Sequence, residues 1–162
     1  MLVFNTKAKS LSSKKKMVKS YQGFRKKEVK TIERLLVKDF MTTNLVTFRP
    51  EQSIEEVVNE LVYRNISGGP VVNEKNELVG IISEGDCLKE LVRVKYSNQP
   101  HLSGIVQDQM AKEVETLSAD TLILDAALAF LEKKIRRFPV LEGGKLVGQI
   151  SQRDVMKALE GR

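Results

Sequence analysis

The stretch "GIISEGD", residues 80–86, returns near the end of the chain as "GQISQRD", residues 148–154. Glycine, serine and aspartate keep their spacing in both copies, as Gly80, Ser83 and Asp86 and as Gly148, Ser151 and Asp154. Each copy begins like a buried strand and passes within a few residues into a helical pattern. A helix that starts this abruptly presents free backbone N–H groups and the positive end of its dipole. Each copy therefore predicts a place where an anion such as phosphate can bind.

The two copies belong to a longer internal repeat. Residues 37–92 align with residues 106–160, and the alignment places Val37 against Val106, Ile54 against Ile123 and Pro70 against Pro139. One residue is lost in the turn that precedes the shared "LVG". A repeat of this length is one supersecondary unit. We therefore divide the chain into a basic N-terminal arm (1–36) with a helix, repeat 1 (37–92), a linker (93–105) and repeat 2 (106–160).

Each repeat predicts the element order β-α-β-β-α. A short extended piece (45–48 or 114–117) precedes an amphipathic helix that begins near Ser53 or Thr121, and Ser53 with Glu56 has the spacing of a capping box. Two β-branched runs joined by a polar turn indicate a hairpin, and a last helix starts after Ser83 or Ser151. One repeat cannot bury both helices and both sheet faces alone. We therefore expect an α/β (α+β) fold in which the two repeats pack as a pseudo-symmetric pair.

The composition is that of a soluble globular protein, with 41% hydrophobic and 30% charged residues. No apolar run is long enough to cross a membrane, and the N-terminal tip lacks the order of a secretory signal, so we expect a cytoplasmic protein. The one cysteine, Cys87, and the one histidine, His101, can make neither a disulfide nor a four-ligand zinc site. Nothing in the sequence pairs a nucleophile with a base, and we expect no catalytic activity.

The positive charge is concentrated in the arm. Residues 1–38 hold twelve Lys and Arg against two acidic residues, and the rest of the chain is mildly acidic. Such an arm can bind nucleic acid, anionic lipid or an acidic partner, or it can be a solvated tail, which is the interpretation we favour. A helix from about Lys19 to Val37, packed on the repeats, is predicted by the apolar spacing of Val29, Ile32, Leu35 and Leu36.

The repeated signature has two interpretations. In the first it binds a nucleotide, because a serine hydroxyl can donate to phosphate and an aspartate can accept from both ribose hydroxyls, as in dinucleotide sites. The glycine would let a base or another backbone segment approach closely. In the second interpretation Ser-x-x-Asp is an ordinary capping box at a helix start. Two copies in matching repeats favour a recognisable unit over a chance pattern.

That unit resembles the cystathionine-β-synthase domain, or CBS domain, arranged as a tandem pair (a Bateman module). The resemblance covers residues 37–159 and rests on "FMTTNLVTF", "ISGGPVVNEKNELVGIISEGD", "QMAKEVETL" and "IRRFPVLEGGKLVGQISQRD". It implies a regulatory sensor that binds AMP, ADP or ATP, with S-adenosylmethionine or NADH less favoured, and that requires no cofactor. It also implies a homodimer shaped as a flat disc, with a regulated partner protein that the sequence does not identify.

The resemblance further implies two clefts shared between the repeats. Site A would combine Ser83, Asp86, Thr116, Arg136, Arg137 and Phe138. Site B would combine Ser151, Asp154, Thr47, Ser67, Gly68 and Gly69. Since guanidinium groups bind phosphate well, the two arginines predict that site A is the better phosphate site. The function we expect is an adenosine-nucleotide sensor. The alternatives are binding of nucleic acid or an acidic partner through the arm, and a structural adaptor with empty clefts.

Overall fold

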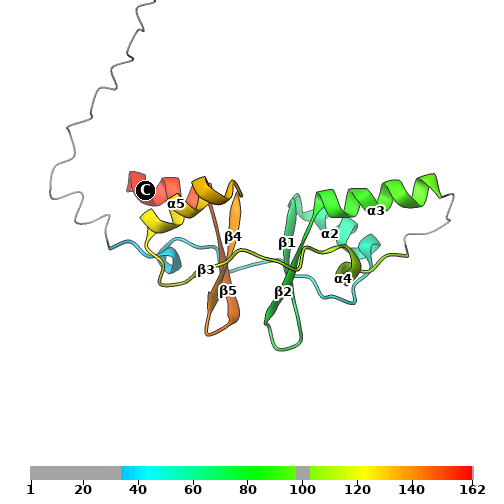
Figure 1. Ribbon diagram of the computed structural model, residues 1–162, viewed down its shortest axis with the longest axis horizontal. Helices are drawn as coiled ribbons and strands as arrows, with labels where there is room; N and C mark the ends of the chain where they lie inside the picture. Colours follow the sequence, from blue (N-terminus) through cyan, green and yellow to red (C-terminus); the bar gives the residue numbers. More distant parts are fainter. Residues whose placement is uncertain (1–33, 98–102, 162) are drawn as a thin grey trace, which may run out of the picture.

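The computed structural model describes residues 34–97 and 103–161, which form two halves side by side (Figure 1). Each half is built mainly from one repeat and combines helices with a small sheet. The longer helices lie toward one edge of the molecule, and both hairpin turns lie at the opposite edge. This arrangement confirms the α+β fold and the pairing of the two repeats that the sequence predicts.

Repeat 1 supplies the two-stranded sheet. Its elements are α2 (Ile54–Arg64), β1 (Gly68–Val72), β2 (Leu78–Ser83) and α3 (Glu84–Tyr96). The capping box at α2 is present, because the Ser53 hydroxyl accepts from the Glu56 amide at 3.2 Å and the Glu56 carboxylate accepts from the Ser53 amide at 3.0 Å. Of the predicted first strand, Phe48 alone forms a bridge, parallel to Val71 of β1. Helix α3 continues beyond the predicted end of repeat 1 at residue 92.

Repeat 2 has the same order and a slightly larger sheet. Its elements are β3 (Leu117–Ser118), α5 (Ile123–Lys133), β4 (Arg137–Glu142), β5 (Lys145–Ser151) and α6 (Gln152–Glu160). The sheet order is β3-β4-β5, with β3 parallel to β4 and β4 antiparallel to β5. Each hairpin has a register shift, between Val71 and Val72 and between Val140 and Leu141, where one residue of the second strand, Val79 or Val147, is left without a partner in the register. The two hairpins are therefore equivalent down to their irregularities.

Each repeat begins on the other half of the molecule. We name residues 35–42 entry segment 1 and residues 104–111 entry segment 2; they contain the short helices η1 (Val37–Asp39) and α4 (Val106–Gln109). Entry segment 1 pairs with repeat 2, since the Val37 amide donates to the Thr121 carbonyl at 2.8 Å. Entry segment 2 pairs with repeat 1 in the same way, from the Val106 amide to the Gln52 carbonyl at 2.9 Å. Figure 1 shows α4 in the half formed by repeat 1.

Each entry segment thus packs on the half formed by the other repeat, an arrangement that we call the exchange. The signature glycines, Gly80 and Gly148, make this exchange possible. A Cβ on Gly80 would lie 2.5 Å from Sδ of Met110 and 2.9 Å from the Ala111 carbonyl oxygen, both in entry segment 2. A Cβ on Gly148 would lie 2.5 Å from Sδ of Met41 and 3.0 Å from the carbonyl oxygen of Thr42 in entry segment 1. Neither position leaves room for a side chain. Of the two predicted reasons for the glycines, the close approach of another backbone segment is the one observed.

The exchange gives each half its own hydrophobic core. The core of repeat 2 contains Val37 of entry segment 1 together with residues such as Ile123, Phe130 and Ile150. The core of repeat 1 contains Val106 of entry segment 2. Residues 37–41 are therefore part of the second half in space, although the sequence suggests that they open the first repeat.

Most of the predicted arm, with its predicted helix from Lys19, lies outside the described residues. The last part of that prediction is wrong. Leu36 is extended and forms a bridge with Leu122, and Leu35 packs against the core of repeat 2. Contacts with the second half thus override the helical spacing of these two leucines.

Candidate nucleotide-binding pocket

A pocket of about 620 Å³ lies where the two repeats meet. Its volume is within the range of small-molecule sites, about 300–1,000 Å³. Repeat 2 contributes Arg136, Arg137, Gln149, Ser151, Gln152, Arg153, Asp154 and Met156. Entry segment 1 and repeat 1 contribute Thr42, Asn44, Leu45, Val46, Ile66, Gly68 and Pro70. The pocket therefore combines a charged wall from one repeat with a neutral wall from the other.

The start of α6 forms one side of the pocket. The Ser151 hydroxyl donates to Oδ2 of Asp154 at 2.6 Å, and the Ser151 amide donates to the same oxygen at 2.9 Å. The Asp154 amide donates in return to the serine oxygen at 3.3 Å. This capping box holds the carboxylate in place. It leaves Oδ1 of Asp154 without a hydrogen-bond partner among the described residues.

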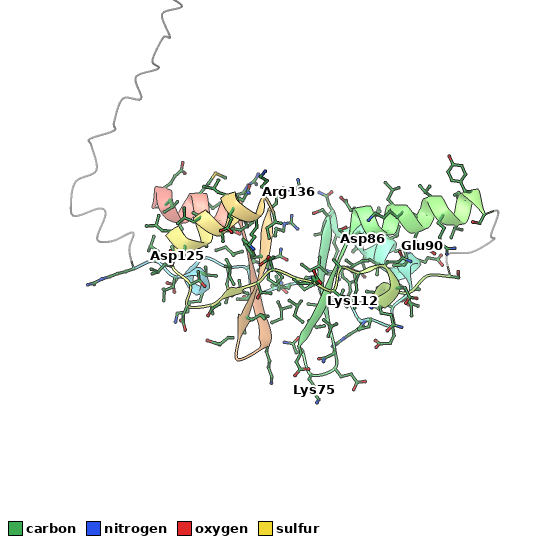
Figure 2. All side chains as sticks on the ribbon, in the orientation of Figure 1. Lys75, Asp86, Glu90, Lys112, Asp125 and Arg136 are labelled. Carbon is green, nitrogen blue, oxygen red and sulfur yellow. The ribbon has the colours of Figure 1, made fainter. Side chains whose placement is uncertain are left out.

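Three arginines face this helix start. Arg136 precedes β4, Arg137 is the first residue of β4 and pairs with Ser151 of β5, and Arg153 is the second residue of α6. In the described part of the chain none of the three guanidinium groups has a hydrogen bond or an ion pair. By contrast, Arg49, Arg64 and Arg93, which lie outside the pocket, each donate to an oxygen of the protein. The pocket thus gathers positive charge that no ion pair among the described residues neutralises. Figure 2 shows Arg136 at the edge where the helices lie.

The neutral wall is positioned by the exchange. Thr42 donates its amide to the Gln149 carbonyl at 2.8 Å and accepts from the Gln149 amide at 2.9 Å, so the chain that follows entry segment 1 runs along repeat 2 into the pocket. Asn44, Leu45 and Val46 then line the pocket. The apolar side chains among the lining residues could contact the flat face of a base.

The equivalent place in repeat 1 has the same backbone and different side chains. Ser83 and Asp86 form the same capping box, with the hydroxyl donating to Oδ2 of Asp86 at 2.5 Å. Oδ1 of Asp86 is occupied, because Lys89 donates to it at 3.3 Å. In the alignment, Ser67, Gly68 and Gly85 stand where repeat 2 has Arg136, Arg137 and Arg153. The three positions that make the pocket cationic are neutral in repeat 1.

The pocket brings together residues from both predicted groups of site residues. Of the predicted site B, Ser151, Asp154 and Gly68 line the pocket together, whereas Thr47, Ser67 and Gly69 do not. Gly69 is buried, and a Cβ there would lie 2.7 Å from the Val46 carbonyl oxygen. Arg136 and Arg137, assigned to site A, line the pocket beside Asp154, because the hairpin register sets Arg137 opposite Ser151.

Two further residues of the predicted site A, Phe138 and Thr116, do not line the pocket. Phe138 is 1% exposed and lies 4.7 Å from Phe130 between ring centroids, in the core of repeat 2. The alternation of β4 places it on the face opposite to Arg137. Thr116 is half-buried, and it does not line the pocket. The two arginines expected beside Ser83 and Asp86 line the pocket beside Asp154 instead.

Several pocket residues were not predicted from the sequence. Thr42, Asn44, Gln152, Arg153 and Met156 all line the pocket. Arg153 lies inside the quoted signature and could have been recognised there, since repeat 1 has a glycine at that place. The contribution of Thr42 and Asn44 depends on the exchange of entry segments, for which no pattern in the sequence gives a signal.

The described residues contain no group of three or more His, Cys, Asp or Glu that could hold a metal ion. Burial raises the pKa of the Cys87 thiol to about 11, which keeps it protonated and a poor nucleophile. No helix in residues 34–97 and 103–161 has the length and apolar character needed to span a membrane.

Comparison with known proteins identifies the repeated unit. The family model for the CBS domain matches twice, at residues 37–93 and 103–161. The chain belongs to the CBS domain family. Among solved CBS structures, CBSX2 of Arabidopsis thaliana in complex with AMP has a TM-score of 0.68 and 30% identity, covering 78% of this chain and 97% of that one.

Two further CBS proteins are similar. The CBS domain pair of protein MJ0100, in complex with 5′-methylthioadenosine and S-adenosyl-L-methionine, has a TM-score of 0.64 and 28% identity over 78% of this chain and 96% of that one. MJ1225 of Methanocaldococcus jannaschii is 28% identical over 123 residues, which are 76% of this chain and 42% of that protein. The chain thus spans less than half the length of this relative.

Proposed function

We propose that this protein is a non-catalytic sensor that binds an adenosine nucleotide in the pocket beside Asp154. The observation that carries the proposal is the set of three arginines without partners in the described chain, Arg136, Arg137 and Arg153, gathered at the start of one helix. Charge-assisted bonds from guanidinium to phosphate are stronger than neutral ones and have a matching planar geometry. AMP, ADP and ATP are the ligands that best match this charge.

Each part of the nucleotide has a proposed contact. Oδ1 of Asp154 accepts from ribose hydroxyls, since the capping box engages only Oδ2. The arginines and the first amides of α6 bind the phosphates. Leu45, Val46, Ile66 and Met156 supply an apolar surface for the base.

We further propose one nucleotide site in each chain. The equivalent carboxylate, Asp86, is engaged by Lys89 and has neutral residues at the three arginine positions. This reverses the expectation that the site around Ser83 and Asp86 is the better phosphate site. The AMP complex of CBSX2 and the S-adenosyl-L-methionine complex of MJ0100 support adenosine compounds as the ligand class.

Exposed apolar side chains support the expected homodimer. They lie on three helices: Val62 and Tyr63 of α2, Leu88, Val92 and Tyr96 of α3, and Leu124, Leu128 and Leu131 of α5. A face of this kind on a soluble protein marks an interaction surface, and we propose that it binds a second copy. Light scattering should give twice the chain mass for the wild type and a single chain mass for Leu128→Glu. A monomeric wild type contradicts the dimer without affecting the nucleotide site.

Thermal unfolding with added ligands tests the sensor. A ligand that binds only the folded state raises the melting temperature with its concentration. We expect AMP and ADP to raise it more than adenosine does, and inorganic phosphate at matched ionic strength to have little effect. If no adenosine compound shifts the melting temperature at millimolar concentration, the sensor is wrong and the structural adaptor is the better interpretation.

A further inference from the structure

Glu90 is the one charged side chain that is buried in the described chain, with 1% of its surface exposed. It lies on α3, and Figure 2 shows it further along this helix than Asp86, beside α4. Arg93 binds both carboxylate oxygens, with Nε 2.7 Å from Oε2 and Nη2 2.5 Å from Oε1. A charge buried in this way destabilises a fold unless its partners are well placed, so its surroundings need an explanation.

Those surroundings belong to entry segment 2. Gln109 of α4 donates its side-chain amide to Oε2 of Glu90 at 3.4 Å. Gly104 lies so close that a Cβ there would be 2.8 Å from Oε1. The same segment is bound to repeat 1 through its backbone, because the Ile54 amide donates to the Gly104 carbonyl at 2.9 Å. Glu90 is thus the polar part of the contact by which repeat 1 holds entry segment 2.

The equivalent contact in repeat 2 is apolar. Ala158 takes the place of Glu90 and is 3% exposed in the core of that repeat. Leu35 and Phe40 of entry segment 1, which correspond to Gly104 and Gln109, pack against this core. All three members of the contact therefore change together, from Glu, Gly and Gln to Ala, Leu and Phe.

This difference affects which repeat pairs with which, within one chain or between two copies. Because both repeats share one backbone plan, repeat 1 of one copy could in principle pair with repeat 1 of another, and repeat 2 with repeat 2. In the first pairing Leu35 and Phe40 would meet Glu90, which leaves a buried carboxylate crowded by Leu35 and with no donor from Phe40. In the second, Gly104 and Gln109 would meet Ala158, which leaves a void and a buried amide with no partner.

We propose that the contact of Glu90 with Gly104 and Gln109 selects the pairing of repeat 1 with repeat 2 and rejects the pairing of like repeats between copies. The polar set acts as a buried asparagine does in a coiled coil, where one polar position specifies the partner at some expense of stability. Specificity of this kind needs an element that disfavours the wrong partner. Here that element is the buried carboxylate of Glu90, which keeps Arg93 but would be crowded by Leu35 and would lose the donor from Gln109.

The test uses the full chain with two reporter cysteines, Thr42→Cys and Ile81→Cys. Thr42 normally pairs with Gln149 of its own chain, and Ile81 normally pairs with Ala111. In like-with-like pairing, Thr42 of one copy would lie against Ile81 of the other, at a separation that a disulfide can bridge. Oxidation after refolding would then give a covalent dimer on a denaturing gel. The native cysteine, Cys87, is buried, and we expect it to form no disulfide in this assay.

Three backgrounds carry the reporters. The triple variant Glu90→Ala, Gly104→Leu, Gln109→Phe gives repeat 1 the apolar contact of repeat 2. The double variant Glu90→Ala, Gln109→Leu removes both polar side chains of the contact without adding bulk at Gly104. It tests the proposal if the triple variant does not fold. The third background is the unaltered contact. A Thr42→Cys, Gln149→Cys chain, which should form only an internal disulfide, serves as the positive control for oxidation.

We expect almost no covalent dimer with the unaltered contact and at least a fivefold increase in the apolar backgrounds. Both apolar variants should still unfold cooperatively, which shows that the contact governs the choice of partner rather than the ability to fold. A dimer fraction that stays within twofold of the unaltered contact in the folded variants would overturn the proposal. The same holds if the unaltered contact already gives abundant covalent dimer.

Discussion

Repeat 1 and repeat 2 share a backbone plan but differ in chemistry at two places. Beside the pocket, repeat 2 has Arg136, Arg137 and Arg153 where repeat 1 has Ser67, Gly68 and Gly85. At the contact with the entry segments, repeat 2 has Ala158 where repeat 1 has Glu90. The shared glycine, serine and aspartate carry the exchange and the helix caps in both repeats. The difference teaches that the repeated signature specifies the fold, whereas the side chains around it decide what is bound.

Ala158→Glu should have the largest effect, because it places the charge of repeat 1 in the apolar contact of repeat 2. The position equivalent to Arg93 is Gly161 in repeat 2, and Leu35 and Phe40 pack against that core. An unpaired buried charge of this kind destabilises a protein by about 3 kcal/mol or more. Chemical denaturation measures the loss, with the exposed Lys157→Glu as control. A loss below about 1 kcal/mol in Ala158→Glu would mean that the two contacts are not as different as their residues suggest.

Asp154→Ala and Asp86→Ala should separate the two capping boxes by function. Each loses a helix cap, which costs about 1 kcal/mol of stability. Only Asp154→Ala should weaken nucleotide binding, by about 1.5–3 kcal/mol, the scale of a hydrogen bond to a charged group. Titration calorimetry with AMP measures the affinity of both variants. Equal weakening in the two variants would contradict one site per chain, and unchanged affinity in both would exclude the ribose role.

Much of this comparison could be predicted from the sequence. The helix start at Ser53 and the equivalence of the two Ser-x-x-Asp pairs follow from local patterns, and the structure has these helix starts. The hairpin register would also have placed Arg137 beside Ser151, because a short turn sets which residues face each other. The resemblance instead implied that both arginines lie beside Asp86, whereas in the structure they line the pocket beside Asp154.

The exchange of entry segments could not be predicted in this way. Val37 and Val106 are both apolar and would suit either core, so the local sequence does not say on which half each one lies. The same holds for Phe138, whose burial depends on the face of β4 that meets α5 and α6. Buried Glu90 gave no signal either, since on a helix a glutamate followed three residues later by an arginine is typical of an exposed pair.

Gly80→Ala and Gly148→Ala should sharpen the comparison further. Both place a methyl group against a methionine and a backbone carbonyl of an entry segment, and overpacking of this kind costs about 1–3 kcal/mol. Gly148→Ala should also weaken nucleotide binding, because it displaces Thr42 at the pocket, whereas Gly80→Ala should not. Gly85→Ala is the matched control. Its Cβ would be 3.6 Å from the Ser83 hydroxyl, and in a helix it should stabilise by about 0.5–1 kcal/mol.

The pH dependence of stability should be the smallest effect. The bonds from Arg93 lower the pKa of Glu90 below its ordinary value of 4.5. A carboxyl group with a lowered pKa in the folded state stabilises the protein above the ordinary pKa, and this stabilisation is lost as the pH falls through the lowered value. Glu90→Gln should remove that part of the acid dependence in unfolding curves between neutral and acidic pH. An acid dependence identical to that of the wild type would show that other carboxylates carry it.

The most direct test of the central claim is a calorimetric titration of adenosine, AMP and ADP into the wild type and into the Arg136→Ala, Arg137→Ala double variant. Arg64→Ala, at an arginine outside the pocket, is the control. We expect the wild type and the control to bind one ligand per chain, with ADP at least as tight as AMP and both at least tenfold tighter than adenosine. The double variant should bind all three with nearly equal, weak affinity. If it keeps the wild-type preference for phosphorylated ligands, the arginines do not bind phosphate and the account of this pocket is wrong.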